Sequence, residues 1–456
     1  MTVVSAQVPP TPLSTLSVLE RDFSSRLRVR PDLSRALVSF QASRAVPVAR
    51  WYKYREGYSA ALVDTYLREL GMEGPILDPF VGSGTTLLAA SALGLESVGI
   101  ELLPIGRRVA GVRAAVAGGR ADPTPLRRVL EERPWRNHAP QPLPELGITR
   151  GAYPPETKEA IERMRGFLAQ HPDPLLELAV LAVLEDVSYT RKDGQYLRWD
   201  HRSGRSLGRF EKGRILPFEE AIARKLGEML ADLAAAPVLT AETGAGRGEM
   251  TVLGGSALEL LPTLPSGTFG GVVTSPPYAN RYDYTRTYAL ELAYLGVDEA
   301  GIKALRQALL SCTVENRPKD LARLNPAWAE VAAVVREDEG VQAMAALMDE
   351  ALRAGRLNNP GIPRMLSGYV LELSCVIAEC ARLLRPGAPL VMVNDNVRYG
   401  GIDLPLDVLF SRLAEQLGFV AERVDVLPGN KGNSSQQMGT HGRSALRKCV
   451  YVWRRA

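Results

Sequence analysis

The sequence predicts an α/β protein with a mostly parallel, seven-stranded sheet that two helical insertions interrupt. A strand, a helix and a second strand follow one another within residues 75–100, which is the βαβ pattern of a parallel sheet. Strand patterns disappear between about 116 and 245, where amphipathic helices stand out. They return near residue 251 and give way to helices again over 298–362. The sheet therefore resumes after each insertion.

Each element follows from hydrophobic spacing that turn residues bound. Helices are expected over residues 58–70, 85–93, 155–170, 218–233, 365–384 and 404–417. Strands are expected over residues 75–77, 97–100, 251–253, 271–273, 389–393, 420–426 and 448–453. The last two strands flank a Gly- and Ser-rich loop, which suggests a hairpin at an edge of the sheet.

The same pattern predicts the domain organisation. The expected parts are an N-terminal arm at 1–45, a cofactor-binding part at 46–115, a helical insertion at 116–245, a catalytic part at 246–297, a second helical insertion at 298–362 and a C-terminal part at 363–456. Residues 46–115, 246–297 and 363–456 would together form the catalytic domain. Little of the chain follows the final strand, so we expect any recognition region to lie in the insertions.

Composition limits the class of protein. With 456 residues, 46% of them hydrophobic, the chain can bury a large core. No apolar run approaches the roughly 20 residues of a membrane span, so we expect a cytoplasmic protein. The four cysteines lack metal-ligand spacing, and Cys375 and Cys380 fit a buried helix face; we expect neither a disulfide nor a metal site. The net charge of +4 is compatible with nucleic acid but does not by itself indicate it.

The segment DPFVGSGTT at 78–86 carries the first chemical motif. Glycines at a strand-to-helix turn allow backbone amides and a helix N-terminus to approach a ligand. A phosphate-binding Walker loop would need a lysine before the Ser/Thr, and a dinucleotide motif would need a glycine where Leu87 stands. Asp78, at the end of the first strand, suits a cationic amino group, and Glu101, at the end of the second, suits two ribose hydroxyls. S-adenosylmethionine offers both groups.

The segment TSPPY at 274–278 directly follows a predicted strand. An aromatic amine is a poor nucleophile because its lone pair is delocalised, so acceptors on its two N–H bonds must favour a pyramidal nitrogen. The Ser275 hydroxyl and the Pro276 carbonyl can accept them, while Pro276 and Pro277 fix the backbone. Tyr278 offers a face on which an extruded base can stack. No cysteine follows a proline, and direct transfer to an amine requires no covalent enzyme intermediate.

Together these two motifs resemble the amino-methyltransferase family of bacterial DNA modification enzymes, and the SPPY form resembles its N4-cytosine branch. The resemblance covers about 46–110, 250–295 and 365–453 and implies a Rossmann-like methyltransferase sheet. The residues that it places around S-adenosylmethionine are Asp78, Pro79, Phe80, Gly82, Gly84, Thr85 and Glu101, with Tyr58 and Ser59 from a looser match over 51–59. The catalytic residues that it implies are Ser275, Pro276, Pro277 and Tyr278.

One position departs from the family pattern. Where the family often has an acidic residue to hold the cofactor adenine, this chain reads Gly254-Gly255-Ser256. Ser256 is the candidate for that contact. Asn394-Asp395-Asn396 also follows a predicted strand and would line a base pocket, although such a segment is more often an ordinary turn.

Residues 189–214 form the strongest nucleic-acid pattern, with eight Lys/Arg against three Asp/Glu and interleaved aromatic residues. A solvated loop with a few packed aromatics is the plain alternative. A second basic, Gly- and Ser-rich segment spans 431–448 and equally fits a plain hairpin loop. The candidate DNA-binding residues are Arg191, Lys192, Tyr196, Arg198, Trp199, Arg202, Arg205, Lys431 and Arg443.

The sequence thus predicts a site-specific DNA methyltransferase that acts on cytosine N4 in double-stranded DNA by base flipping. It would be a monomer or homodimer, with a cognate restriction endonuclease as a possible partner. Adenine N6 methylation shares the chemistry and is the nearest alternative. An RNA methyltransferase and a non-catalytic DNA-binding module are further alternatives, which substrate trials and cofactor binding would separate.

Overall fold

The computed structural model describes residues 11–34, 36–55, 57–193, 196–205, 209–241, 247–428 and 446–456. Its contacts divide the chain into two compact units, one comprising Met1–Ser34, Leu261–Arg281 and Leu310–Ala456, the other Arg35–Leu260 and Tyr282–Leu309. The first glycine-rich motif therefore belongs with the first insertion. The TSPPY motif belongs with the C-terminal strands and most of the second insertion.

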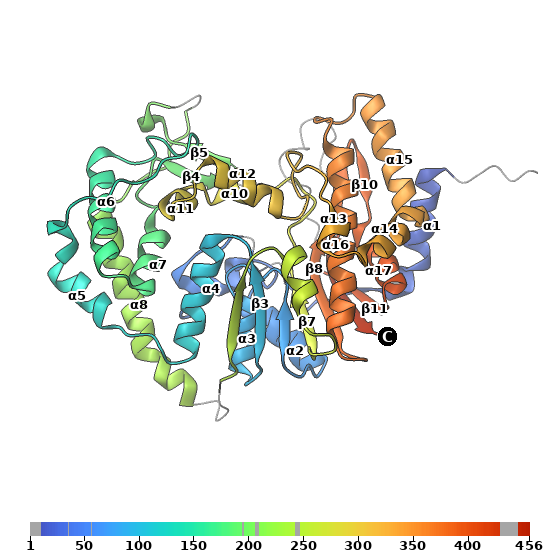
Figure 1. The fold of residues 1–456 in the computed structure, drawn as a ribbon, viewed down its shortest axis with the longest axis horizontal. Coiled ribbons are helices and arrows are strands. Elements are labelled where there is room, and N and C mark those ends of the chain that lie inside the picture. The colour runs from blue at the N-terminus through green and yellow to red at the C-terminus, as the bar shows by residue number, and fades with distance from the viewer. Residues whose placement is uncertain are drawn as a thin grey trace, which may run out of the picture. The chain divides into compact units, whose positions relative to one another are not determined.

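The unit that contains the glycine-rich motif has three parallel strands in the order β2-β3-β6. Its elements along the strands are α2 (Ala60–Glu69), β2 (Ile76–Asp78), α3 (Thr85–Ala92), β3 (Ser97–Glu101), α4 (Pro104–Ala117), β6 (Met250–Gly254) and α9 (Ala257–Leu260). Glu101 pairs with Gly254 in the β3–β6 register. Because the strands are parallel, the residues that follow β2, β3 and β6 lie together at the carboxyl ends of the strands. Figure 1 shows α3 and α4 beside these strands.

The first insertion adds helices and one hairpin to this unit. The helices of the insertion are α5 (Thr124–Glu132), α6 (Pro155–Gln170), α7 (Pro174–Val183) and α8 (Phe218–Ala241), with the short 3-10 turns η4 (Pro134–Asn137) and η5 (His201–Ser203). Outside the insertion, the same unit also contains α10 (Tyr284–Thr287), α11 (Ala289–Tyr294), α12 (Glu299–Ala308) and the 3-10 turns η2 (Phe40–Ala45) and η3 (Ala49–Trp51). The strands β4 (Thr190–Asp193) and β5 (Tyr196–Trp199) form an antiparallel pair. The expectation that 116–245 lacks strands is wrong at this hairpin, because its alternating burial arises within a basic segment that no hydrophobic alternation marks.

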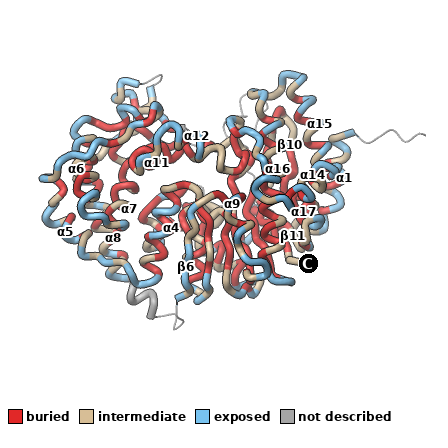
Figure 2. The backbone as a smooth tube through the Cα atoms, in the orientation of Figure 1, coloured by how far each residue is buried: buried red, intermediate tan, exposed pale blue. Residues whose placement is uncertain are grey.

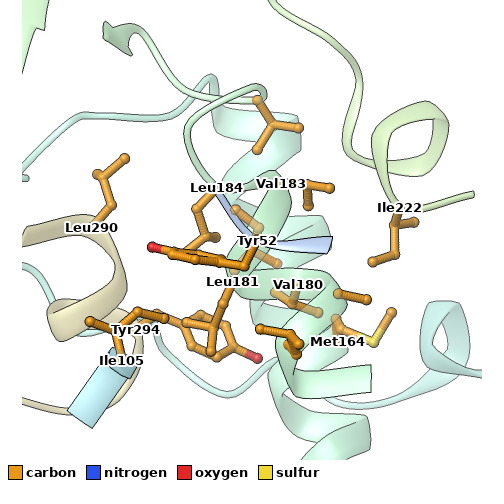
Figure 3. Packing of buried hydrophobic residues seen from close by; sticks show 14 of the residues in the cluster. Tyr52, Ile105, Met164, Val180, Leu181, Val183, Leu184, Ile222, Leu290 and Tyr294 are labelled. Carbon is orange, nitrogen blue, oxygen red and sulfur yellow. The ribbon is translucent and has the colours of Figure 1, made fainter. Parts of the chain in front are cut away.

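One hydrophobic core joins the insertion helices to α4 and α11 within this unit. Figure 3 shows Ile105 of α4, Met164 of α6, Val180 and Leu181 of α7 and Tyr294 of α11 packed together. Figure 2 shows α7 buried along most of its length, whereas α5 and α6 also expose residues. The helix α7 is therefore the central element of the insertion.

Five strands of the other unit follow one another in the order β1-β11-β12-β8-β7, and β9 and β10 form a separate antiparallel pair. Its elements are α1 (Pro12–Asp22), η1 (Ser24–Arg26), β1 (Leu27–Val29), η6 (Leu261–Thr263), β7 (Gly271–Thr274), α13 (Leu321–Leu324), α14 (Trp328–Glu337), α15 (Glu339–Arg353), α16 (Ile362–Leu383), β8 (Pro389–Asp395), β9 (Val397–Tyr399), β10 (Ile402–Leu404), α17 (Leu406–Gln416), β11 (Phe419–Val426) and β12 (Lys448–Arg455). The pairs β7–β8 and β1–β11 are parallel, whereas β12 is antiparallel to both β8 and β11.

Two features of these strands differ from the prediction. The expected terminal hairpin does not form an edge, because β12 lies between β11 and β8. The strand β1, which comes from the N-terminal arm, pairs with β11 and raises the number of strands from the expected seven to eight. Three residues of β1 are too few for a hydrophobic pattern to identify from sequence. The mixed α/β class with mostly parallel strands is confirmed.

The second insertion is helical, as expected, through α12, α13, α14 and α15. The helices α14 and α15 pack on α16, which buries Cys375 and Cys380 as small hydrophobic residues. Among the described residues, no helix is both long and apolar enough to span a bilayer.

Candidate cofactor site and catalytic motif

The glycine-rich turn joins β2 to α3 through backbone conformations that favour glycine. Gly82 has φ +52° and Gly84, which caps α3, has φ +83°. A Cβ added at Gly82 would lie 3.1 Å from Cε1 of Tyr54, and one at Gly84 would lie 3.1 Å from Cβ of Ala110. Any side chain at these positions would be strained as well as crowded. The two glycines therefore let Tyr54 and Ala110 pack closely on the turn at the N-terminus of α3.

Asp78 ends β2 with its side chain buried, 1% exposed. Its Oδ1 accepts a hydrogen bond from the Phe80 amide at 3.0 Å, and its Oδ2 accepts one from the Tyr58 hydroxyl at 3.2 Å. The Tyr58 hydroxyl also contacts Oγ1 of Thr86. These bonds fix the orientation of the Asp78 carboxylate at the carboxyl end of β2. A carboxylate held in this way is suited to a cationic group.

Glu101 ends β3 and is also buried, 7% exposed. Its Oε1 accepts a hydrogen bond from the Leu103 amide at 2.7 Å. Burial raises the pKa of Glu101 from 4.5 to about 8, against the opposing effect of the Leu103 and Gly82 amides, and the nearby Asp78 raises it further. Near neutral pH this carboxyl group is largely protonated, and hydroxyl donors that hydrogen-bond to the carboxylate would favour its ionised form.

The helix α4 passes close to Glu101 at Gly106. A Cβ on Gly106 would lie 2.7 Å from Cδ of Glu101 and 2.9 Å from the Gly82 carbonyl oxygen. Gly106 was not among the predicted site residues. Its signal in the sequence is a glycine inside a helix, which usually has a packing or functional reason.

The other predicted cofactor residues lie after β2, before α2, at the start of α3 and after β6. Pro79 is buried and Phe80 half-buried after Asp78, and Thr85 is the first residue of α3. Ser59 caps α2, because its hydroxyl oxygen accepts a hydrogen bond from the Leu62 amide at 3.2 Å. The Ser256 hydroxyl follows β6 and donates to the Ala308 carbonyl at 3.0 Å. This bond leaves the Ser256 oxygen able to accept from a donor such as an amine.

Arg113 of α4 supports the glycine turn and was missed by the sequence reasoning. Its side chain is 2% exposed, and its Nη1 donates to the Ser83 carbonyl at 2.7 Å and to the Ser83 hydroxyl at 2.9 Å. Nη2 donates to the Ala49 carbonyl at 2.8 Å. Burial lowers the pKa of Arg113 to about 10. The available signal was an arginine on an otherwise apolar helix face.

The TSPPY motif begins where β7 ends, beside β8 in the other unit. Thr274 is paired with Met392, and Pro276 and Pro277 are buried immediately beyond it. The Ser275 hydroxyl donates to the Tyr278 hydroxyl oxygen at 3.2 Å. Burial and the Asp395 carboxylate raise the pKa of Tyr278, so the phenol stays neutral. The motif therefore presents a serine hydroxyl and a neutral tyrosine together.

Neighbouring residues hold this motif in place. The Tyr399 hydroxyl of β9 donates to the Ala279 carbonyl at 2.6 Å. Nδ2 of Asn394 donates to the Tyr369 hydroxyl oxygen at 3.3 Å, and Oδ1 of Asn394 accepts from the Asp395 backbone amide at 2.9 Å. Asn396 accepts from the Asp407 amide at 2.9 Å. The amides of Asn394 and Asn396 thus have structural partners, and Asp395 is the member of that segment whose charge acts on Tyr278.

The structure separates the basic hairpin residues into two faces. Arg191 pairs with Arg198, and both are exposed, whereas Lys192 pairs with Leu197 on the inner face. Lys192 is 4% exposed and forms an ion pair with Glu291. This arrangement contradicts a phosphate-binding role for Lys192. It lies inside because side chains alternate along a strand, a distinction that composition alone does not make.

The remaining candidate DNA-binding residues differ in the contacts that their side chains make. Arg202 makes two bonds to Asp200, 2.7 and 2.9 Å, and one to the Gly213 carbonyl. Arg205 lies over the Trp199 ring, 4.6 Å from its centroid, and donates to the Gly147 carbonyl at 2.7 Å. Of Tyr196 the structure describes only the backbone, and Lys431 and Arg443 lie outside the described residues.

Comparisons with known proteins agree with this geometry. A family model described as a DNA methylase, N6_N4_Mtase, matches residues 60–104. The Type II methyltransferase M.AvaI of Nostoc sp. is 46% identical over 451 residues, covering 96% of this chain and 92% of its own. The Type II methyltransferase M.BsoBI of Geobacillus stearothermophilus is 36% identical over 467 residues, covering 95% and 91%. The rRNA methyltransferase aviRa from Streptomyces viridochromogenes aligns over 92% of this chain and 90% of its own with 11% identity, but its TM-score of 0.27 is too low to carry an argument.

Proposed function

This chain belongs to the amino-methyltransferase family of DNA methylases, and we propose that it methylates the N4 amine of cytosine in a short duplex DNA motif with S-adenosylmethionine as the methyl donor. The observation that carries the proposal is Ser275-Pro276-Pro277-Tyr278, held at the end of β7 with the Ser275 and Tyr278 hydroxyls in contact. Two Type II methyltransferases at 46% and 36% identity support a role beside a cognate restriction endonuclease.

The chemistry of the motif fits an exocyclic amine. The Ser275 oxygen and the Pro276 carbonyl accept hydrogen bonds from the two N–H groups of the base amine, so its lone pair is freed for attack. The Tyr278 ring stacks on the extruded base, and its hydroxyl stays neutral because its pKa is raised. Positive charge develops on the nitrogen during attack, and the two acceptors stabilise it.

The cofactor site fits S-adenosylmethionine. Asp78 would bind the amino group of the methionine part, and Glu101 would accept from the ribose hydroxyls. The positive-φ backbone at Gly82 and Gly84 forms the turn at the N-terminus of α3, where the methionine part would lie. When bound, the cofactor supplies an activated methyl group. Ser256 is the proposed acceptor for the adenine amine.

We assign DNA contact to the exposed face of the β4–β5 hairpin and leave Lys192 out of the set. Arg191 and Arg198 lie directly opposite each other on that face, and Arg198 forms an exposed ion pair with Asp193 at 2.8 Å. Exposed guanidinium groups on one face suit contact with DNA phosphates. Trp199 lies on the inner face with Leu197 and packs against the core, with the Arg205 guanidinium over its ring, so we leave it out of this exposed set as well.

Cofactor affinity is expected to depend on pH through Glu101. Its pKa is about 8 in the free protein, and ribose hydroxyls bind the ionised carboxylate, so binding below pH 8 must release a proton. The Kd for S-adenosylmethionine should therefore fall as pH rises from 6 to 8, by up to about tenfold per pH unit, and level off above 8. Titration calorimetry in two buffers of different ionisation enthalpy would measure both the Kd and the proton released.

The Glu101→Gln variant is the reference for this experiment, because it keeps the size of the side chain and cannot ionise. The ratio of the Kd of the variant to that of the wild type isolates the contribution of Glu101 from any titration of the cofactor. A ratio that stays constant between pH 6 and 8 would contradict the assignment of Glu101 to the ribose.

The proposed function is tested by locating the transferred methyl group. The protein is incubated with duplex DNA and S-adenosylmethionine labelled in the methyl group, with RNA offered in parallel, and the products are digested to nucleosides. We expect the label in N4-methyldeoxycytidine. Label in N6-methyldeoxyadenosine would overturn the assignment of the base, and label on a ring carbon or in RNA would overturn the mechanism or the substrate.

A further inference from the structure

The inner face of the β4–β5 hairpin carries a buried charge pair that the proposed reaction does not use. Lys192 is 4% exposed and Glu291 of α11 is 1% exposed, and the Lys192 ammonium contacts Oε1 of Glu291. The Tyr52 hydroxyl donates to the same oxygen at 2.9 Å. The ring of Tyr52 lies within the hydrophobic core in Figure 3.

Stability does not explain this pair. Removing two charges from water costs several kcal/mol, and a buried pair often stabilises no more than apolar residues of the same volume. Among the described residues, Oε2 of Glu291 and the Tyr153 hydroxyl are also buried with no hydrogen-bond partner. The pair sits in a core where leucine and valine predominate. The role of the Lys192–Glu291 pair is therefore to be sought in the neighbouring side chains that it orients.

Two stacked aromatic rings lead from the pair to the cofactor turn. The Lys192 ammonium lies 4.6 Å from the centroid of the Tyr288 ring. Tyr288 stacks on Tyr54 with 5.1 Å between centroids and an interplanar angle of 19°. Tyr54 in turn lies against Gly82, where an added Cβ would be 3.1 Å from its Cε1 atom.

Hydrogen bonds fix the same arrangement from a second side. The Tyr288 hydroxyl oxygen accepts from the Arg55 amide at 3.2 Å. The Arg55 guanidinium pairs with Glu185 at 3.0 Å, and Glu185 accepts from the Lys192 amide at 2.9 Å. Side chain and backbone of Lys192 therefore both act on the segment that carries Tyr54.

We propose that Lys192 and Glu291 are positioning residues for the cofactor, which act through Tyr288 and Tyr54 to hold the Gly82 turn in its binding conformation. The proposal rests on the proposed use of that turn for S-adenosylmethionine. Lys192 touches neither the base nor the cofactor in this role. It links the hairpin that we assign to DNA with the turn that binds the methyl donor.

The test removes both charges together, because removing only one would leave an uncompensated buried charge. In Lys192→Met/Glu291→Gln, the Kd for S-adenosylmethionine measured by calorimetry without DNA should rise roughly tenfold, since networks of this kind modulate binding by 0.5–2 kcal/mol. A variant that folds, as judged by its melting curve, and binds with the wild-type Kd would overturn the proposal.

A second buried lysine–glutamate pair provides a matched control. Lys319 and Glu372 belong to the other unit, 2.8 Å apart, with side chains 9% and 2% exposed. Lys319→Met/Glu372→Gln should change the Tm by about as much as Lys192→Met/Glu291→Gln and leave the Kd within about twofold, because Glu372 bonds to Ser311 and not to the cofactor turn. Equal losses of affinity in both double variants would indicate a general effect of stability and would overturn the proposal.

Substitutions at Tyr288 separate the ring from the hydroxyl. Tyr288→Phe keeps the stack on Tyr54 and should bind with nearly the wild-type Kd, whereas Tyr288→Leu loses the stack and should match the Lys192/Glu291 double variant. The reverse order would overturn the aromatic path. If the wild-type protein itself fails to bind S-adenosylmethionine, the proposed function fails; if it binds and the variants bind equally well, only this inference fails.

Discussion

Ser275→Ala is expected to lower the rate of methyl transfer about a hundredfold, the effect typical of losing one preorganised polar contact to a transition state. The Ser275 oxygen is one of the two acceptors that free the lone pair of the base amine, and it lies 3.2 Å from the Tyr278 hydroxyl in this structure. The Kd for S-adenosylmethionine should stay within about twofold, since Asp78 and Glu101 remain. Single-turnover transfer of labelled methyl to DNA measures the rate, and calorimetry measures the Kd.

Tyr278 provides the comparison for Ser275. Tyr278→Phe removes the hydroxyl that accepts from Ser275 but keeps the stacking ring, so it should retain most of the transfer rate. Tyr278→Ala removes the ring and should lower turnover strongly with little change in cofactor affinity. If the Ser275→Ala variant lost cofactor affinity as much as it lost rate, the assignment of Ser275 to the base would be wrong.

Asp78→Asn is expected to weaken S-adenosylmethionine binding about a hundredfold, because it removes a charge-assisted hydrogen bond worth about 1.5–3 kcal/mol. Asparagine keeps the size of the side chain and can still accept from the Phe80 amide, so the turn after β2 should persist. Equilibrium binding of the cofactor to the purified variant gives the result, and its rate at saturating cofactor should fall far less.

Asp64 offers a control for this substitution. It lies on α2 in an exposed pair with Arg68, at 2.9 Å, and such surface pairs contribute little. Asp64→Asn should bind the cofactor as the wild type does. A normal Kd in Asp78→Asn together with a reduced rate would instead place Asp78 in the chemical step.

The sequence alone was enough for the elements of the site that lie within continuous segments. The strand, glycine turn and helix over 76–92 and the TSPPY motif after β7 were predicted with correct order and type. In these segments, local spacing and the chemistry of the turn determine the backbone. The family followed from the same two motifs and is borne out over 96% of the chain.

The sequence did not predict the contacts between segments that are distant along the chain. Nothing in the spacing of Arg113 indicates that it bonds to Ser83, and nothing at Tyr54 indicates that its ring lies on Gly82. The three-residue strand β1 was likewise invisible, because its only evidence is its pairing with β11. These features depend on which elements pack together, and a local pattern does not contain that information.

The β4–β5 hairpin shows most clearly what the sequence determined and what only the tertiary structure decided. Its charge and aromatic residues could be counted from the sequence, and they predicted one DNA-binding patch that included Lys192. Only the tertiary structure decided that Arg191 and Arg198 face outward while Lys192 pairs with Glu291 in the core. The physical reason is that side chains alternate between the two faces of a strand, and the face that is buried is chosen by the helices that pack against it.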